Sequence, residues 1–230
     1  MFLVLFLPLL IPIVKMTTHI IFDMNGVITD DEHCHEMATK EAFGTLGLNV
    51  SPDIYRTYCL GRTDVAAFTD LFNDFAIKQV DILSTIEKKT EIYLGLVEEN
   101  LKIYPGVVEC IQRLSSSYTL ALTTSSTRVE VSSTLGLTGL TDTFDVILTA
   151  ENVSKGKPDP EPYLLTLQEL KAKASECMVI EDSENGIKSA KAAGIRCLAI
   201  PNTETIDKLA LADGIFHNYS ELTKELFDSL

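Results

Sequence analysis

The sequence contains little cysteine, and no two cysteines are spaced as a metal-binding or redox pair. The five cysteines are odd in number and widely separated, at positions 34, 59, 110, 177 and 197. A zinc site or redox motif normally uses a Cys-x-x-Cys spacing and a disulfide framework an even number, so the sequence argues against both. Scattered thiols of this kind are typical of a reducing compartment, and we expect a cytoplasmic protein.

Positive charge is also scarce. The chain carries 19 Lys and Arg against 33 Asp and Glu, which gives a net charge of -14. Because no basic surface is available to attract a phosphate backbone or an anionic bilayer, we expect neither nucleic acid nor a membrane as a partner. A small anionic substrate would need a local group of cations or a metal ion in its site.

Long apolar runs are missing after the first fifteen residues. That first segment reads MFLVLFLPLLIPIVK and differs in composition from the rest of the chain. It is shorter than the roughly 20 residues that span a bilayer, lacks a basic start and a small-residue cleavage site, and contains two helix-weakening prolines. We expect residues 1–15 to lie outside the fold, with a signal anchor as the alternative.

From residue 17 onward, short apolar runs alternate with helix-like segments. Near-continuous hydrophobicity is typical of strands buried on both faces of a parallel sheet. The predicted strands are residues 19–23, 119–125, 144–150, 177–183 and 196–202. Two predicted helices carry apolar stripes at three- and four-residue spacing, Val107, Val108, Ile111 and Leu114 in one and Tyr163, Leu164, Leu167 and Leu170 in the other. This pattern predicts a doubly wound parallel α/β fold.

One interval breaks the alternation. Residues 31–103 contain no convincing strand but include helix-like stretches such as HEMATKEAFGTLG and DILSTIEKKTEIYLGLVEENL. The interval is far longer than a crossover between parallel strands requires. We therefore predict an all-helical cap at 31–103, inserted into an α/β core that comprises residues 16–30 and 104–230.

Polar side chains collect where the predicted strands end. Asp23 follows the first strand, the hydroxyl cluster TTSS the second, SKGKPDPEPY the third and EDS the fourth. Ligands of open α/β sheets bind beyond the carboxyl ends of the strands, so these groups should share one rim. Each also has a structural alternative, because Asn25-Gly26 is a hairpin signal and strand-end Asp or Thr residues often cap helices.

In this order the segments resemble the four motifs of the haloacid dehalogenase (HAD) superfamily, in the branch with a helical cap after the first motif. FDMNGVITD matches the first motif, LALTTSS the second, GKPDPEPY the third and VIEDSENGIKSAKAAG the fourth. The resemblance covers residues 17–230. It implies a HAD-like, Rossmann-like core and a relation to sugar-phosphate phosphatases and β-phosphoglucomutases. We expect a small phosphorylated substrate and a monomer or weak homodimer.

The resemblance implies that Asp23 is a nucleophile, which attacks a phosphate monoester and becomes an aspartyl phosphate. Because the substrate is a dianion, this reaction requires neutralised charge and in-line positioning, which Mg²⁺ and a lysine would provide. The implied ligands are all oxygen donors suited to Mg²⁺. They are Asp23, Asp182, Glu181 and the backbone carbonyl of Asn25.

The other motif residues would hold the substrate phosphate. The family pattern implies that Thr124 and the Ser125 amide bind phosphoryl oxygens. It also implies that Lys157 contacts both the phosphate and the nucleophile. Gly26 would let the backbone come close to the metal and the phosphate.

The predicted cap supplies two candidate substrate contacts. His35 falls where relatives of the mutase type place a substrate-loop histidine. LGRTD at 60–64 resembles the family's cap substrate loop. Arg62 in that loop is a candidate for a distal anionic group of the substrate, because a guanidinium binds carboxylate or phosphate at two points; a surface arginine is the alternative.

Asn25 departs from the family pattern. Most phosphatases and mutases of this family have a second aspartate there, which protonates the leaving oxygen and later activates water. An amide cannot exchange a proton near neutral pH, and loss of general acid–base catalysis typically costs a factor of about 10² to 10⁴. The proton could come from another group instead. The candidates near in sequence are Asp30, Glu32, His33 and His35.

We therefore predict a Mg²⁺-dependent phosphatase with impaired or rerouted proton transfer. A phosphate-binding relative with little turnover, acting as a sensor or regulator, is the main alternative. A β-phosphoglucomutase-like mutase is a weaker one, because it needs both an acid and a base. A phosphonate hydrolase would need a Schiff-base lysine in the cap, for which the candidates are Lys40, Lys78, Lys88, Lys89 and Lys102.

Overall fold

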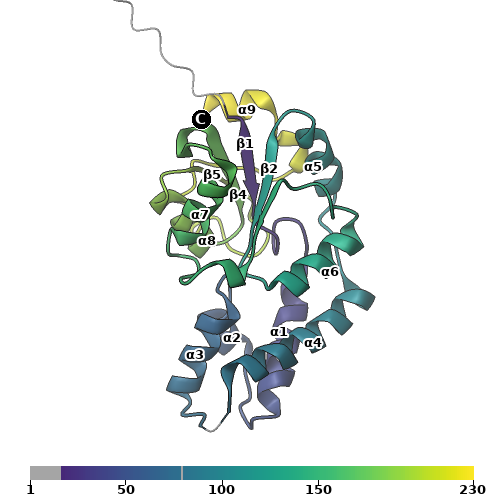
Figure 1. The fold of residues 1–230 in the computed structure, drawn as a ribbon, viewed down its shortest axis with the longest axis vertical. Coiled ribbons are helices and arrows are strands. Elements are labelled where there is room, and N and C mark those ends of the chain that lie inside the picture. The colour runs from purple at the N-terminus through teal and green to yellow at the C-terminus, as the bar shows by residue number, and fades with distance from the viewer. Residues whose placement is uncertain (1–16, 79) are drawn as a thin grey trace, which may run out of the picture.

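The computed structural model describes residues 17–78 and 80–230; the predicted apolar leader, residues 1–15, lies outside them. The described residues form a six-stranded parallel sheet with the strand order β3-β2-β1-β4-β5-β6 (Figure 1). The strands are β1 (His19–Phe22), β2 (Thr119–Thr123), β3 (Val146–Leu148), β4 (Cys177–Glu181), β5 (Arg196–Ala199) and β6 (Gly214–Ile215). The five predicted strands are confirmed, and β6 was not predicted because two residues carry no pattern.

Helices cover both faces of this sheet and one of its ends. The helices of the described residues are α1 (Glu32–Gly44), α2 (Pro52–Tyr58), α3 (Asp64–Asp74), α4 (Ile82–Asn100), α5 (Val107–Ser115), α6 (Arg128–Thr138), α7 (Glu161–Leu170), α8 (Glu184–Ala192) and α9 (Lys224–Ser229). None of them is both long enough and apolar enough to cross a bilayer.

Two apolar clusters fill the two faces of the sheet. Ile20 and Phe22 of β1 belong to one cluster, and Ile21 between them belongs to the other, as the alternation of side chains along a strand requires. Helices α5, α6 and α9 pack on the first face, and α7 and α8 on the second. The predicted stripe of α7 is wrong at Leu164, which is 48% exposed, because this helix turns Tyr163 toward the sheet instead.

Helices α1–α4 form the predicted helical insertion between β1 and β2. Figure 1 shows them together beyond one end of the sheet. They have an apolar cluster of their own, in which the rings of Phe43 and Phe68 meet edge to face with centroids 4.7 Å apart. Two chain segments connect this block to the sheet, and they run side by side, because the Asp30 amide donates to the Lys102 carbonyl at 2.9 Å.

The position of β1 explains where the polar residues gather. Strand β1 pairs in parallel with β2 on one side and β4 on the other. Neighbouring connections therefore leave in opposite directions at its carboxyl end, which opens a crevice there. The hairpin alternative for Asn25-Gly26 is wrong, since the segment that follows β1 does not become its partner in the sheet.

Candidate active site

Asp23 stands at the head of the crevice. Its backbone amide continues the β1–β4 ladder by donating to the Ile180 carbonyl at 3.0 Å. Its carboxylate, in a residue that is 8% exposed, reaches the Lys157 ammonium, with Oδ1 2.7 Å from Nζ. Lys157 Nζ also lies 2.6 Å from Glu181 Oε1 and 3.1 Å from the Thr123 carbonyl. One buried cation thus joins the ends of three adjacent strands.

Three carboxylates crowd this point. Asp23, Glu181 and Asp182 each offer an oxygen, and these oxygens lie within 4.8 Å of one another. Burial raises the pKa of Asp23 to about 7, with a further contribution from Glu181 against the opposing effect of Lys157. Burial and the charges of Glu181 and Asp23 raise the pKa of Asp182 well above its usual value. Lys157 balances only part of the negative charge, so the cluster fits a divalent cation with oxygen ligands.

Glu181 differs from the other two carboxylates. Its Oε1 accepts hydrogen bonds from Lys157 and from the Tyr163 hydroxyl at 3.0 Å. Its Oε2 accepts from the amides of Asp182 and Ser183 and from the Ser183 hydroxyl. Although burial opposes it, Lys157 lowers the pKa of Glu181. Both oxygens of Glu181 therefore already accept hydrogen bonds from the protein, and Glu181 holds Lys157 in place. Asp23 and Asp182 have more oxygen lone pairs available to bind a metal ion.

Gly26 allows the loop after Asp23 to approach Asp182. Its φ is +78°, and a Cβ at this position would overlap the Asp182 carboxylate and lie 2.8 Å from Thr203 Cγ2, so glycine is required for both reasons. Asn202 holds the loop from the C-terminal segment, by donating from Nδ2 to the Gly26 carbonyl at 2.7 Å. The approach of the backbone to a metal and a phosphate at Gly26 stays a prediction, and the contact with Asp182 is compatible with it.

The predicted hydroxyl cluster faces Asn25. Ser126 Oγ donates to Asn25 Oδ1 at 2.7 Å, and Thr124 Oγ1 donates to the same oxygen at 3.3 Å. Thr124 and Ser125 line the pocket together with Asp23 and Lys157. These hydroxyls therefore lie where a phosphate beside Asp23 could accept hydrogen bonds from them.

The other end of the Asn25 amide points toward a buried carboxylate. Asn25 Nδ2 donates to Asp31, with 3.0 Å to Oδ2 and 3.1 Å to Oδ1. Asp31 also accepts from the Thr29 hydroxyl at 2.9 Å and the Tyr93 hydroxyl at 2.6 Å. Because two carboxylate oxygens face it, this end of Asn25 must be the NH₂ group. The amide is thus fixed at both ends and cannot act as an acid or a base.

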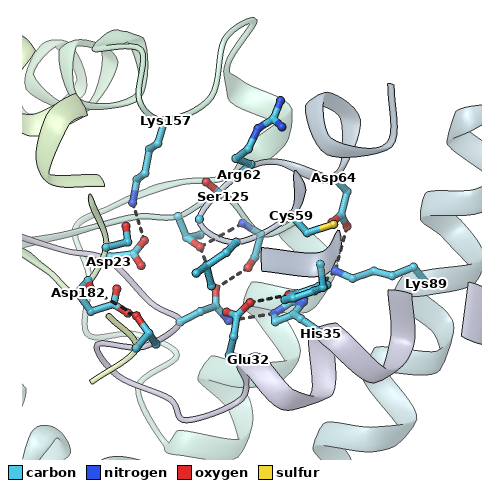
Figure 2. A pocket seen from close by; sticks show the side chains of 18 residues that line it. Asp23, Glu32, His35, Cys59, Arg62, Asp64, Lys89, Ser125, Lys157 and Asp182 are labelled. Carbon is cyan, nitrogen blue, oxygen red and sulfur yellow. Dashed lines mark hydrogen bonds and ion pairs between the residues drawn. The ribbon is translucent and has the colours of Figure 1, made fainter. Parts of the chain in front are cut away.

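A buried network joins the helical block to the core. Lys89 of α4 has its Nζ 2.8 Å from Glu130 Oε1 of α6 and 2.9 Å from Asp64 Oδ2. The same ammonium lies 2.8 Å from His35 Nδ1. Figure 2 shows Lys89, His35 and Glu32 on one side of the pocket and Asp23, Asp182 and Lys157 on the other. The predicted His35 therefore does line the pocket, next to a cation that the sequence did not suggest as its neighbour.

Arg62 lies at the edge of the pocket but is already paired. Its guanidinium is 2.6 Å from Asp70 Oδ2 and donates to the Tyr58 carbonyl at 3.0 Å. In Figure 2 the side chain points away from Asp23 and Asp182. The stated alternative, a surface arginine that does not contact the substrate, fits this geometry better than a substrate anchor does, although only 24% of the side chain is exposed.

The Schiff-base alternative has one candidate with access to the pocket. Of the five lysines considered, Lys89 lines it. Although burial opposes the effect, Asp64 and Glu130 raise the pKa of Lys89. A Schiff-base lysine needs the opposite shift, because only the neutral amine attacks a carbonyl. This arrangement does not favour a phosphonate hydrolase.

Sequence reasoning missed several residues that line the pocket from the helical block. Tyr55 of α2 belongs to this set, while Lys89 was named only as a Schiff-base candidate and Asp64 only as the last residue of LGRTD. No local pattern marks them, since each is an ordinary member of an amphipathic helix or its cap. Glu130 had a detectable signal, because TRVE forms a capping box with Thr127 at the start of α6.

Comparisons with known proteins agree with the predicted resemblance. The family model described as "Haloacid dehalogenase-like hydrolase" matches residues 20–200. The "Validoxylamine A 7'-phosphate phosphatase" of Streptomyces hygroscopicus subsp. limoneus is 30% identical over 204 residues, which cover 88% of this chain and 94% of that protein. The "Phosphorylated carbohydrates phosphatase" of Thermotoga maritima is 34% identical over 178 residues, or 76% and 81% of the two chains. The crystal structure of CbbY from Rhodobacter sphaeroides in complex with phosphate has a TM-score of 0.83 and 26% identity, and the match covers 94% of this chain and 100% of CbbY.

Proposed function

This chain belongs to the haloacid dehalogenase-like hydrolase family, and we propose that it is a Mg²⁺-dependent phosphatase of small phosphorylated sugars that forms an aspartyl phosphate on Asp23. The observation that carries the proposal is the contact between Asp23 and Lys157 inside a cluster of three carboxylates. The sugar-phosphate phosphatases among its relatives support the substrate class.

Each of the pocket residues would have a separate role in the reaction. Asp23 supplies the attacking oxygen, and Lys157 holds that carboxylate in place and balances charge on the phosphate. Thr124 and Ser125 orient the phosphoryl oxygens. Glu181 fixes Lys157 rather than the substrate.

Mg²⁺ would bind Asp23, Asp182 and the carbonyl of Asn25, and when bound it would neutralise charge on the phosphate. Asn25 contributes only its backbone to this set, so its amide side chain does not weaken the site. Gly26 supports the same arrangement, because it lets this carbonyl segment lie against Asp182.

The helical block at 31–103 is proposed to be a cap that excludes water from the reaction. The two connections that run side by side at Asp30 and Lys102 are its natural hinge. The contact between Lys89 and Glu130 would hold the closed position, since it joins α4 of the cap to α6 of the core.

The two cap cations that line the pocket, Arg62 and Lys89, are both paired already, which leaves little positive charge there for a second anionic group of the substrate. Asp70 pairs with Arg62, and Asp64 and Glu130 pair with Lys89. A monophosphate whose remaining part is a neutral polyol fits this pocket better than a bisphosphate. The five free buried cysteines support a reducing compartment such as the cytoplasm.

A phosphate-binding protein with little turnover is the competing function, and the fixed amide of Asn25 favours it. A mutase is disfavoured by the same residue, because transfer between two hydroxyls requires both an acid and a base.

A panel of sugar phosphates, with release of inorganic phosphate as the readout, tests the proposal on the wild type, Asp23→Asn and Asp30→Asn. We expect Mg²⁺-dependent hydrolysis that chelation abolishes, that Asp23→Asn removes and that Asp30→Asn retains. Phosphate binding without hydrolysis of any sugar phosphate would establish the competing function. Turnover that survives Asp23→Asn would overturn the proposed nucleophile.

A further inference from the structure

If Asn25 cannot move a proton, the proposed phosphatase needs another group that can. The leaving alkoxide of a sugar is a poor leaving group and must be protonated as it departs, and water must later lose a proton to attack the phosphoenzyme. A replacement must line the pocket, have an oxygen or nitrogen free to face the substrate, and exist in both protonation states near neutral pH.

The histidines do not meet these conditions. The ammonium of Lys89 can only donate, so His35 Nδ1 accepts at 2.8 Å. Burial and the positive charge of Lys89 lower the pKa of His35, so the imidazole is neutral near pH 7. Its remaining proton, on the Nε2 that lies 3.1 Å from Asn25 Nδ2, is far too weakly acidic to protonate a leaving alkoxide. His33 lies outside the pocket, where its Nε2 is 3.3 Å from Cys34 Sγ.

The neighbouring aspartates do not meet them either. Asp31 is fully buried and already accepts from Asn25, Thr29 and Tyr93. Asp30 lies in the hinge connection and is not among the residues that line the pocket.

Glu32 meets all three conditions. It is the first residue of α1, and its side chain lines the pocket. The Tyr55 hydroxyl of α2 donates to its Oε1 at 2.5 Å. No hydrogen bond joins its Oε2 to any residue in the described part of the chain, so this oxygen is available to a substrate. Figure 2 shows Glu32 on the cap side, across the pocket from Asp23.

The environment of Glu32 also sets its protonation. Burial raises its pKa to about 7, and the hydrogen bond from Tyr55 opposes this effect. Both forms are therefore present near neutral pH, as a group that serves first as an acid and then as a base requires. The titratable groups that face Glu32 are Asp31 beside it, Tyr55 of α2, Cys59 after α2, Lys89 of α4, Tyr104 before α5, and Asp23 and Asp182 at the ends of β1 and β4.

We propose that Glu32 carries the proton that Asn25 cannot carry, first to the leaving oxygen and then from water, an inference that rests on the proposed phosphatase function. In the first step the Asp23 carboxylate forms a bond to phosphorus, the bond to the sugar oxygen breaks, and the Glu32 carboxyl gives its proton to that oxygen. In the second, water attacks phosphorus, its proton passes to the Glu32 carboxylate, and the bond to Asp23 breaks. The products are the free sugar, inorganic phosphate and the starting forms of both carboxyls.

Glu32→Gln tests this step, with two substrates that differ in their need for a proton. For the fastest sugar phosphate of the panel, we expect kcat/KM to fall by about 10² to 10⁴. For p-nitrophenyl phosphate, whose leaving group departs without a proton, kcat/KM should fall by less than about tenfold. Its kcat should fall strongly, with a burst of p-nitrophenolate, because hydrolysis of the phosphoenzyme loses its base.

The pH profile separates proton transfer from a structural effect. In the wild type, kcat/KM for the sugar phosphate should fall above about pH 7, where Glu32 loses its acid form, and Glu32→Gln should lack this limb. Tyr55→Phe should move the limb to higher pH, because the Tyr55 hydroxyl lowers the pKa of Glu32. Glu36→Gln, one turn further along α1, is the matched control. It should leave kcat/KM unchanged for both substrates.

Equal losses for both substrates, or an unchanged pH limb in Glu32→Gln, would overturn the role of Glu32 while the phosphatase stands. If the wild type hydrolyses no sugar phosphate in the panel, the proposed function fails and Glu32 has no proton to carry.

Discussion

The Asn25 amide nitrogen lies 3.0 Å from one carboxylate oxygen of Asp31 and 3.1 Å from the other. An amide and a buried carboxylate thus form a matched pair directly behind the nucleophile. A carboxylate at position 25 would face Asp31 with a like charge. The amide of Asn25 therefore matches the buried carboxylate beside it. The absence of the family's second aspartate at position 25 is accompanied by Asp31 as its partner.

This pairing predicts that Asn25→Asp alone destabilises the fold. It replaces a hydrogen bond to a charged group by repulsion, which should lower the free energy of unfolding by about 1–3 kcal/mol. The added change Asp31→Asn should recover most of that loss, and urea unfolding of the two single variants and the double variant measures the coupling. If Asn25→Asp is as stable as the wild type, the pair does not constrain position 25.

Lys157 should be essential for stability as well as for activity. Lys157→Met leaves Asp23 and Glu181 buried together without their cation, and removal of one partner from a buried ion pair costs about 3–5 kcal/mol. Lys155→Met is the matched control, because that side chain is 73% exposed and lies 3.7 Å from its partner Asp159. Denaturant midpoints that are equal in the two variants would contradict the buried pairing.

Gly26→Ala should abolish Mg²⁺-dependent activity. The added Cβ would overlap the Asp182 carboxylate, and the positive φ is itself unfavourable for alanine. Gly95→Ala in α4 is the control, since a Cβ there meets no atom within 4 Å, and it should stabilise the helix by about 0.5–1 kcal/mol. Titration of each variant with Mg²⁺, followed by thermal unfolding, separates lost metal binding from a general loss of stability. Mg²⁺ that stabilises Gly26→Ala as it does the wild type would place the metal elsewhere.

The pKa of Asp23 predicts how stability depends on pH and Mg²⁺. Because burial raises it from 3.8 to about 7, the folded state binds more protons than the unfolded state between these values. Stability without metal should therefore decrease as the pH rises through this range. Added Mg²⁺ binds the ionised carboxylates, so the increase in Tm that it causes should be larger at about pH 8 than at about pH 5. An increase that is the same at both values would show that the cation does not bind this cluster. Asp23→Asn should reduce the pH dependence of stability without metal and that of the increase in Tm caused by Mg²⁺.

Site residues next to a strand end could be predicted from the sequence, because the apolar run of the strand marks where it ends. Asp23 and Asp182 stand directly after buried runs, and the parallel sheet brings such positions to one edge. The helical insertion could be predicted for a similar reason, since its length and periodicity are local properties.

Contacts between helices of the insertion, and between the insertion and the core, could not be predicted in this way. Glu32 meets Tyr55 and Lys89 meets Glu130 only after the helices have docked, and no spacing in the sequence encodes that docking. Arg62 is the opposite case. Its motif suggested a contact with the substrate, but its guanidinium forms an ion pair with Asp70 of α3. The exposure of Leu164 likewise depends on which face of α7 the sheet accepts.

The most direct test is to find where the phosphoryl group resides during turnover. The enzyme, mixed with Mg²⁺ and its fastest sugar phosphate and quenched in acid, can be digested and sequenced by mass spectrometry. We expect one added phosphoryl group on Asp23. With p-nitrophenyl phosphate, which forms the phosphoenzyme without a proton, Glu32→Gln should show a higher occupancy than the wild type, because its phosphoenzyme should hydrolyse slowly. Release of inorganic phosphate with Asp23 unmodified in both proteins, or a phosphoryl group on another side chain, would contradict the proposed mechanism.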